Sequence, residues 1–145
     1  MISQTLASIL QKKGHEIHSV APDAPVHEAI AIMAEKGVAA VLVLAEGDLV
    51  GIVSAKDYGR RVVLLGRSAK DTRVQEIMTH PVVTVTLDVS MTECMGIMTH
   101  YHIRHLPVFN KSELVGVVSM GDLVSAVISD QEFHIDQLMR YMGQK

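Results

Sequence analysis

The chain has 145 residues, of which 48% are hydrophobic and 20% charged, and its formal net charge is -3. This balance supplies enough apolar surface for a packed core and argues against disorder. The acidic net charge argues against non-specific binding to nucleic acid or to an anionic membrane surface, because either would need concentrated positive charge.

The number of cysteines and the composition of the N-terminal residues indicate the cellular compartment. Cys94 is the only cysteine, which excludes an internal disulfide and favours a reducing compartment. Residues 1–12 lack the apolar stretch and cleavage site of a signal peptide. No apolar run approaches the ~18 residues that a membrane span needs. We therefore expect a soluble, cytoplasmic protein.

The first half of the chain alternates helical and extended patterns. Apolar residues at positions i, i+3, i+4 and i+7 indicate helices, and continuous apolar runs indicate buried strands. Glycines follow the first two helical patterns, and Pro25 suits a helix start. The expected elements are a helix at 2–12, an extended segment at 15–20, a helix from Val26 to Gly37, a strand at 38–44, a turn at 46–48, a strand at 49–53 and a helix at about 57–65.

The second half repeats this order at a shift of 65 residues. The stretch Leu49-Val50-Gly51-Ile52-Val53-Ser54-Ala55-Lys56-Asp57 returns as Leu114-Val115-Gly116-Val117-Val118-Ser119-Met120-Gly121-Asp122. Each copy is a short apolar strand that runs into Ser-x-x-Asp, the pattern of a strand-to-helix corner. The second copy adds a capping box at Ser90 and Glu93 and a strand expected from Ile103 to Phe109. Self-similarity at a fixed period identifies an internal repeat.

These patterns divide the chain into four segments. They are an N-terminal helix at 1–14, a first repeat at 15–70, a second repeat at 71–130 and a C-terminal helix at 131–145. The last segment has apolar residues at roughly helical spacing and no partner in the first half. It either covers the core of its own chain or forms a dimer contact, and the sequence leaves both alternatives open.

Residues 15–130 resemble the tandem cystathionine β-synthase (CBS) domain pair, and more narrowly its stand-alone bacterial members. The resemblance depends on the repeated Gly-x-Val-Ser-x-x-Asp, on Glu76-Ile77-Met78-Thr79, and on His102-Ile103-Arg104-His105-Leu106-Pro107-Val108. It implies an α+β fold of two β-α-β-β-α repeats related by a pseudo-two-fold axis, with flanking helices. It also implies clefts between the repeats that bind adenosyl ligands.

By this resemblance each cleft takes residues from both repeats. One pocket would use Ile17, His18, Val38 and Ala39 for the base, with Arg104, His105, Ser119 and Asp122 for the ribose and phosphate. The other would combine Thr79, Val83 and Ile103 with Ser54, Lys56, Asp57 and Arg60.

The residue types suit an adenosine phosphate. Asp57 and Asp122 can accept hydrogen bonds from both ribose hydroxyls, which contributes about 1.5–3 kcal/mol. Ser54 and Ser119 stand at helix starts, where free N–H groups and the helix dipole favour an anion. Ser-x-x-Asp is equally a helix-capping motif, and this structural role is the alternative to binding.

The two pockets are expected to differ in charge. The second repeat has His102-Ile103-Arg104-His105 where the first has the uncharged Gly37-Val38-Ala39-Ala40. The family resemblance makes Arg104 and His105 the principal candidates for phosphate ligands, and the alternative is that they lie on a solvated strand end. A phosphate beside His105 would raise its pKa toward or above the free value of about 6.5, so that binding would strengthen as the pH falls through this range.

Other chemistry finds little support in the sequence. His100, His102 and His105 are close together, but on one strand the first two would share a face and His105 would point the other way. No cysteine or carboxylate completes a metal-binding set. Cys94 falls on an apolar helical stripe and is expected in the core. Because there is also no Walker loop, no Gly-x-Gly-x-x-Gly and no nucleophilic triad, we expect a binding protein without a metal, and not an enzyme.

The predicted function is a regulatory module that senses an adenine nucleotide. AMP is the favoured ligand, and ADP, ATP or NAD(H) are the alternatives. A homodimer is expected from the family, together with a downstream protein that the sequence does not identify. The alternative is a structural or protein-interaction module with vestigial pockets.

Overall fold

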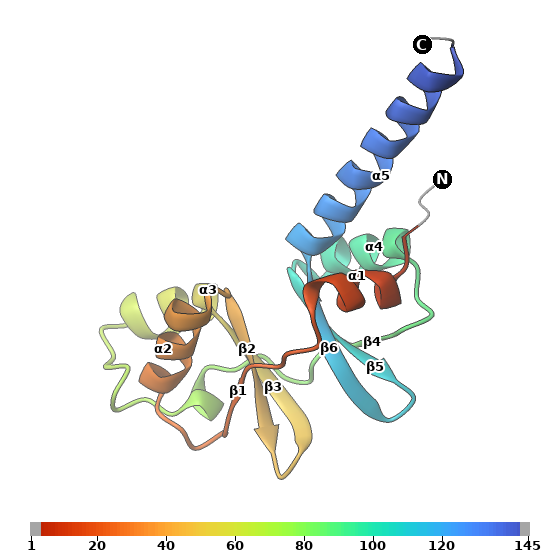
Figure 1. Cartoon of the computed structure of the whole chain (residues 1–145). Coiled ribbons are helices and arrows are strands. Elements are labelled where there is room, and N and C mark those ends of the chain that lie inside the picture. The colour runs from red at the N-terminus through yellow and green to blue at the C-terminus, as the bar shows by residue number, and fades with distance from the viewer. Residues whose placement is uncertain (1–3, 143–145) are drawn as a thin grey trace. The chain divides into compact units, whose positions relative to one another are not determined.

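The computed structural model describes residues 4–142 and divides the chain into two compact units. The first-repeat unit consists of residues 17–82. The second-repeat unit combines the N-terminal segment up to residue 16 with the chain from residue 83 onward. The N-terminal helix therefore packs with the second repeat, although the first repeat follows it in sequence (Figure 1). Residues 1–3, with Ile2 of the expected first helix, and residues 143–145 lie outside the described residues.

Each unit contains one three-stranded sheet, and the two sheets have the same topology. The first strand runs parallel to the second, which forms an antiparallel hairpin with the third. The register also repeats, because Val43 is opposite Gly51 and Val108 is opposite Gly116. The expected α+β class and repeated strand order are thus confirmed. The strands are β1 (Ser19–Val20), β2 (Ala40–Ala45), β3 (Asp48–Ser54), β4 (Val85–Thr86), β5 (His105–Asn110) and β6 (Glu113–Ser119).

A helix of 11 residues packs against the sheet in each unit at the equivalent place. Helix α2 (Val26–Lys36) and helix α4 (Met91–Tyr101) bury the apolar stripes expected from sequence, and Cys94 lies fully buried in the core. Gly37 ends α2 in the left-handed conformation with φ 67°, and His102 takes the equivalent place after α4 with φ 56°. The second hairpin consequently begins at His105 and not at Ile103, because His102 still belongs to the helix cap.

The helices that follow β3 and β6 differ between the repeats. The helix expected at 57–65 starts and ends two residues earlier and is not a single α-helix, because it consists of α3 (Ala55–Tyr58) and a π-helical turn, Gly59–Val63. In the second repeat, α5 (Met120–Tyr141) is one continuous helix of 22 residues that contains most of the segment expected as a separate C-terminal helix. No glycine or proline interrupts it after residue 121, so no residue there strongly opposes the helical backbone.

Segments from outside each repeat lie against the third strand of each sheet. Helix α1 (Leu6–Lys13) starts at a Thr5 cap and ends at Gly14, as expected. Leu10 of α1 is in contact with Gly116 of β6, and Met78 lies in the same way against Gly51 of β3. A 3₁₀ turn, Val74–Glu76, precedes Met78. The glycines have no side chain at these places, and this allows the crossing segments to approach the strands closely.

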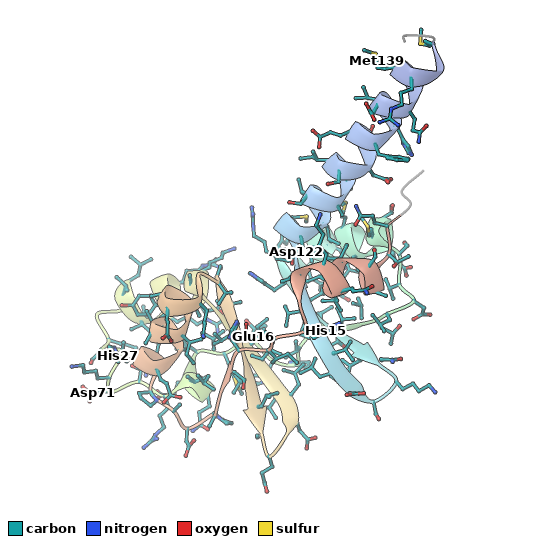
Figure 2. All side chains as sticks on the ribbon, in the orientation of Figure 1. His15, Glu16, His27, Asp71, Asp122 and Met139 are labelled. Atoms are coloured by element: carbon teal, nitrogen blue, oxygen red, sulfur yellow. The ribbon has the colours of Figure 1, made fainter. Side chains whose placement is uncertain are left out.

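The end of α5 extends beyond the core of its unit. Residues 131–140 are all exposed, and Figure 2 shows Met139 near the far end of the helix. The apolar residues Phe133, Ile135, Leu138 and Met139 are between 56% and 63% exposed. The alternative in which this segment covers the core of its own chain is therefore wrong, and the dimer contact stays a prediction. Within residues 4–142, no helix is both long and apolar enough to cross a membrane.

Candidate functional site

The two Ser-x-x-Asp motifs form the same local structure. Ser54 accepts a hydrogen bond from the Asp57 backbone N–H at 3.2 Å, while Asp57 Oδ2 accepts from the Ser54 N–H at 2.9 Å and from its hydroxyl at 3.0 Å. In the second repeat, Ser119 accepts from the Asp122 N–H at 3.1 Å, and Asp122 Oδ2 accepts from the Ser119 N–H at 2.8 Å. Both motifs are therefore reciprocal capping boxes, which confirms the structural alternative without excluding a ligand.

The second hairpin brings four predicted binding residues together. His105 is opposite Ser119 across the β5–β6 pair, and the Met120 N–H donates to the Arg104 carbonyl at 2.9 Å. Asp122 follows within the first turn of α5. His105, Ser119 and Asp122 are half-buried and Arg104 is exposed. A carboxylate, an imidazole and a helix start thus occupy one corner of the second-repeat unit, and the charge of Arg104 is near enough to act on His105.

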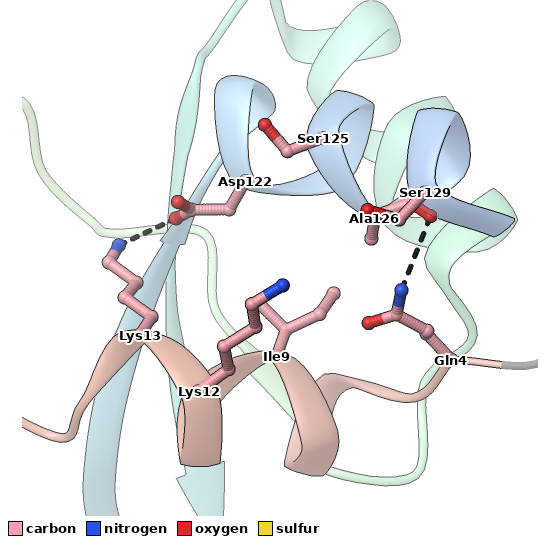
Figure 3. A pocket seen from close by; sticks show the side chains of 8 residues that line it. All are labelled: Gln4, Ile9, Lys12, Lys13, Asp122, Ser125, Ala126 and Ser129. Atoms are coloured by element: carbon pink, nitrogen blue, oxygen red, sulfur yellow. Dashed lines mark hydrogen bonds and ion pairs between the residues drawn. The ribbon is translucent and has the colours of Figure 1, made fainter. Parts of the chain in front are cut away.

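Lys13 is a member of this corner that the sequence analysis missed. Its Nζ is 2.6 Å from Asp122 Oδ2 (Figure 3). The same Nζ donates to the Val117 carbonyl at 2.7 Å. Lys13 precedes Asp122 by 109 positions, and no local pattern marks it as a partner. Only the packing of α1 on the second repeat places it here.

The charges at this corner shift two pKa values. Burial acts to raise the pKa of Asp122, but hydrogen bonds from Lys13 and Ser119 outweigh it and hold that pKa below its ordinary value of 3.8. Burial, aided by the charge of Lys13, lowers the pKa of His105 below 6.5, while the charge of Asp122 opposes the change. Without a ligand, His105 is therefore mostly uncharged at neutral pH, and a phosphate would act against this lowering.

A cavity of about 350 Å³ adjoins Asp122 within the second-repeat unit. It lies between α1 and the first turns of α5, as Figure 3 shows. Its lining residues are Gln4, Ile9, Lys12, Lys13, Asp122, Ser125, Ala126 and Ser129. Of these, only Asp122 was predicted from sequence.

The equivalent corner of the first-repeat unit has a different composition. Ala40 is opposite Ser54, and the Ala55 N–H donates to the Ala39 carbonyl at 2.9 Å, so the backbone matches the second repeat. Lys56 and Arg60 are exposed, one in the first turn of α3 and the other in the π-helical turn. The cations of this corner therefore lie on the helical segment after β3, whereas Arg104 and His105 lie where β5 begins. A charge difference between the two pockets stays a prediction.

The remaining predicted residues are distributed over both units. Ile17, His18, Val38, Ala39 and Thr79 lie in the first-repeat unit, and Val83 and Ile103 lie in the second-repeat unit. The His18 carbonyl accepts from the Leu42 N–H at 2.9 Å, which fixes this segment beside β2. Each predicted pocket would need residues of both units, so the two pockets stay predictions.

Three neighbouring histidines were assumed from the sequence to share one strand, and this assumption is wrong. His100 belongs to α4, His102 caps that helix and His105 starts β5. Over residues 4–142, no group of three or more His, Cys, Asp and Glu side chains is arranged to hold a metal ion. Burial, with a contribution from the charge of Glu93, raises the pKa of the Cys94 thiol to about 11, so Cys94 is not an activated nucleophile.

Comparisons with known proteins give the family. Residues 9–62 and 74–129 both match the family model of the CBS domain. The chain is therefore a member of the CBS-domain family and contains a tandem pair of these domains, which confirms the resemblance found in the sequence.

Relatives and solved structures support the same assignment. The chain is 32% identical over 149 residues to the mitochondrial CBS domain-containing protein CBSX3 of Arabidopsis thaliana, covering 97% of this chain and 72% of the relative. A CBS-domain protein from Burkholderia ambifaria superposes with a TM-score of 0.85 at 47% identity, over 88% of this chain and 96% of that one. A CBS domain protein from Pyrobaculum aerophilum, solved in complex with AMP, shares the fold with a TM-score of 0.72 at 24% identity, over 82% and 89% of the two chains.

Proposed function

We propose that this protein is a non-catalytic regulatory module that binds an adenine nucleotide, AMP or alternatively ADP, ATP or NAD(H), in clefts between its two repeats. The observation that carries the proposal is the corner around Asp122. There a carboxylate suited to a ribose diol lies beside Arg104 and His105, which suit a phosphate, and beside the start of α5.

The capping role of Asp122 is compatible with ligand binding. The capping N–H and Lys13 both donate to Oδ2, and a carboxylate has about four acceptor positions on its two oxygens. The ribose hydroxyls can therefore use the remaining positions. Asp57 also accepts its capping hydrogen bonds on Oδ2, from the N–H and the hydroxyl of Ser54, and Lys56 and Arg60 would be the cations of a second, unequal pocket.

The adenine base would occupy an apolar slot supplied by the opposite repeat. Ile17, His18, Val38 and Ala39 would form it in the pocket of Asp122, and Thr79, Val83 and Ile103 in the pocket of Asp57. The AMP complex of the Pyrobaculum aerophilum protein supports nucleotide binding in general, because a chain with this fold was solved with AMP.

Regulation would follow from the position of the ligand between two repeats. A nucleotide that binds one arrangement of the repeats more tightly than another shifts the population toward the first, whereas equal affinity shifts nothing. The module would act on a downstream protein as a homodimer.

A protein-interaction module with vestigial pockets is the second candidate. Two observations favour it: both Asp residues are already used in capping boxes, and the end of α5 exposes four large apolar side chains. Exposed apolar surface of this kind is typical of protein contacts.

Thermal unfolding with AMP, ADP, ATP, NAD⁺ and NADH distinguishes the two candidates. A ligand at 100 times its Kd stabilises the folded protein by about 2.7 kcal/mol, so a sensor melts at a higher temperature with at least one nucleotide. We expect Asp122→Asn to remove the part of this shift that comes from the pocket of Asp122. Asp57→Asn should remove the part that comes from the pocket of Asp57. If no nucleotide shifts the wild-type transition, the interaction module is the better description.

Each Asp variant also loses part of a helix cap, so a matched control is needed. Ser90→Ala removes the cap of α4, where Ser90 accepts from the Glu93 N–H at 3.0 Å. It should lower the melting temperature through a loss of about 1 kcal/mol and keep the full nucleotide shift. Chromatography of the nucleotide after incubation should show no turnover if the protein is only a binder.

A further inference from the structure

The cavity between α1 and α5 has chemistry that the proposed ribose site does not use. Its volume of about 350 Å³ falls at the lower end of the range for small-molecule pockets, about 300–1,000 Å³. All its lining residues belong to the second-repeat unit, and Asp122 lies at its edge.

Most polar groups that line the cavity are hydrogen-bond donors. Lys12 and Lys13 contribute two ammonium groups, and Ser125 and Ser129 contribute hydroxyls. The carboxylate of Asp122 is paired with Lys13 at 2.6 Å. Lys12 has no ion-pair partner among the residues that the structure describes, and Figure 3 shows its side chain extending between the two helices. The cavity therefore has an excess of positive charge and suits an anion with several oxygens.

We propose that this cavity binds the phosphates beyond the first in a nucleoside di- or triphosphate whose ribose is held at Asp122. The inference rests on the proposed function, because it takes Asp122 as the ribose carboxylate. Arg104 and His105 would contact the first phosphate, and Lys12 of α1, with Ser125 of α5 across the cavity, would contact the next. The pocket of Asp122 would then discriminate ADP and ATP from AMP.

The first-repeat unit does not reproduce this arrangement. The Val117 carbonyl that accepts from Lys13 corresponds to the carbonyl of Ile52, which accepts from the backbone N–H of Thr79 at 2.9 Å. A backbone segment thus fills the place that a lysine side chain occupies in the second repeat. The preference for a polyphosphate would accordingly belong to the pocket of Asp122 alone.

Calorimetric titration with AMP and ADP, which differ by one phosphate, tests the inference. Because hydrogen bonds to a charged group contribute about 1.5–3 kcal/mol, we expect the wild-type protein to bind ADP at least about tenfold more tightly than AMP. Lys12→Gln should abolish this difference and leave the AMP affinity within about twofold. Lys111→Gln, in the exposed turn of the same unit, should preserve both affinities.

The outcomes separate this inference from the proposed function. AMP binding with ADP no tighter, or a Lys12→Gln variant that keeps the preference for ADP, overturns the inference and leaves the nucleotide sensor standing. Equal weakening of AMP and ADP by Lys12→Gln also overturns it, because Lys12 would then contact the nucleoside or the first phosphate. Failure of every adenine nucleotide to bind removes the proposed function and the inference with it.

Discussion

Substitution of Gly116 by alanine tests how closely α1 packs on the second sheet. A methyl group on Gly116 would lie 2.8 Å from Leu10 Cδ2 and 3.3 Å from Cδ1, well inside the ~3.5–4.0 Å of favourable carbon contacts. Leu10 is 0% exposed and cannot turn into solvent. We therefore expect Gly116→Ala to lower the free energy of unfolding by about 1–3 kcal/mol, the usual cost of overpacking.

A double-mutant cycle with Leu10→Ala isolates the contact. Leu10→Ala alone should cost about 2–5 kcal/mol, because it leaves a cavity under α1. The double variant should be less destabilised than the sum of the single variants, by about 1–2 kcal/mol, since the smaller residue 10 makes room for the new methyl group. Urea denaturation followed by circular dichroism gives the three differences.

Gly121→Ala is the matched control, because a methyl group there would meet only the Ser119 hydroxyl at 3.6 Å. It should leave stability unchanged or raise it slightly. Strict additivity of Gly116→Ala and Leu10→Ala would refute the reasoning, since it would mean that residues 10 and 116 are not in contact and that α1 packs elsewhere.

Four further predictions concern single residues. Gly96→Ala, in an exposed part of α4 with open space around it, should raise stability by about 0.5–1 kcal/mol in thermal melts. Cys94, with a pKa of about 11, should not react with a thiol reagent at about pH 8 until the protein unfolds. The lowered pKa of Asp122 implies stabilisation that is present above its ordinary pKa and lost as the pH falls through the lowered value, and Lys13→Met should reduce this acid sensitivity in urea titrations. Nucleotide affinity should rise as the pH falls toward the lowered pKa of ligand-free His105, because a bound phosphate would raise that pKa, and His105→Ala should flatten this slope after correction for the ligand's own ionisation.

Specific results would contradict each of these predictions. A less stable Gly96→Ala would show that this face of α4 is covered, and prompt labelling of folded protein would place Cys94 outside the core. If Lys13→Met loses stability at low pH in the same way as the wild type, the ion pair with Asp122 contributes nothing to the free energy of unfolding. For the pH slope, His102→Ala is the control, because this exposed residue belongs to the same repeat and should leave the slope intact.

Local patterns predicted the repeated hairpins and the Ser-x-x-Asp caps, although the first strand of each hairpin begins two residues later than expected, at Ala40 and His105. The strand expected at 49–53 is β3, one residue longer at each end, and both Ser-x-x-Asp motifs are helix starts. Side-chain period, turn residues and capping chemistry act over a few neighbouring residues, so they can be read from the chain directly. The same holds for the buried stripe that contains Cys94.

Features that depend on distant contacts could not be predicted in this way. Nothing near Lys13 indicates that it pairs with Asp122, because the pairing exists only after α1 packs on the second repeat. The left-handed conformation of His102 was hidden as well, since residues other than glycine rarely adopt it. Comparison of the repeats offered one signal, because His102 occupies the position of the helix-ending Gly37.

The order of the chain within the two units determines how proteolysis and expression of fragments would affect each unit. Because the first-repeat unit is inserted into the second-repeat unit, the polypeptide passes between them twice, near residues 16 and 82. A protease that cleaves one passage leaves the halves covalently joined through the other, and release of either half requires both cuts. A gene fragment that begins at residue 83 encodes a second sheet without the helix that normally covers β6, whereas residues 17–82 contain every strand of the first sheet and can be expressed as one uninterrupted piece.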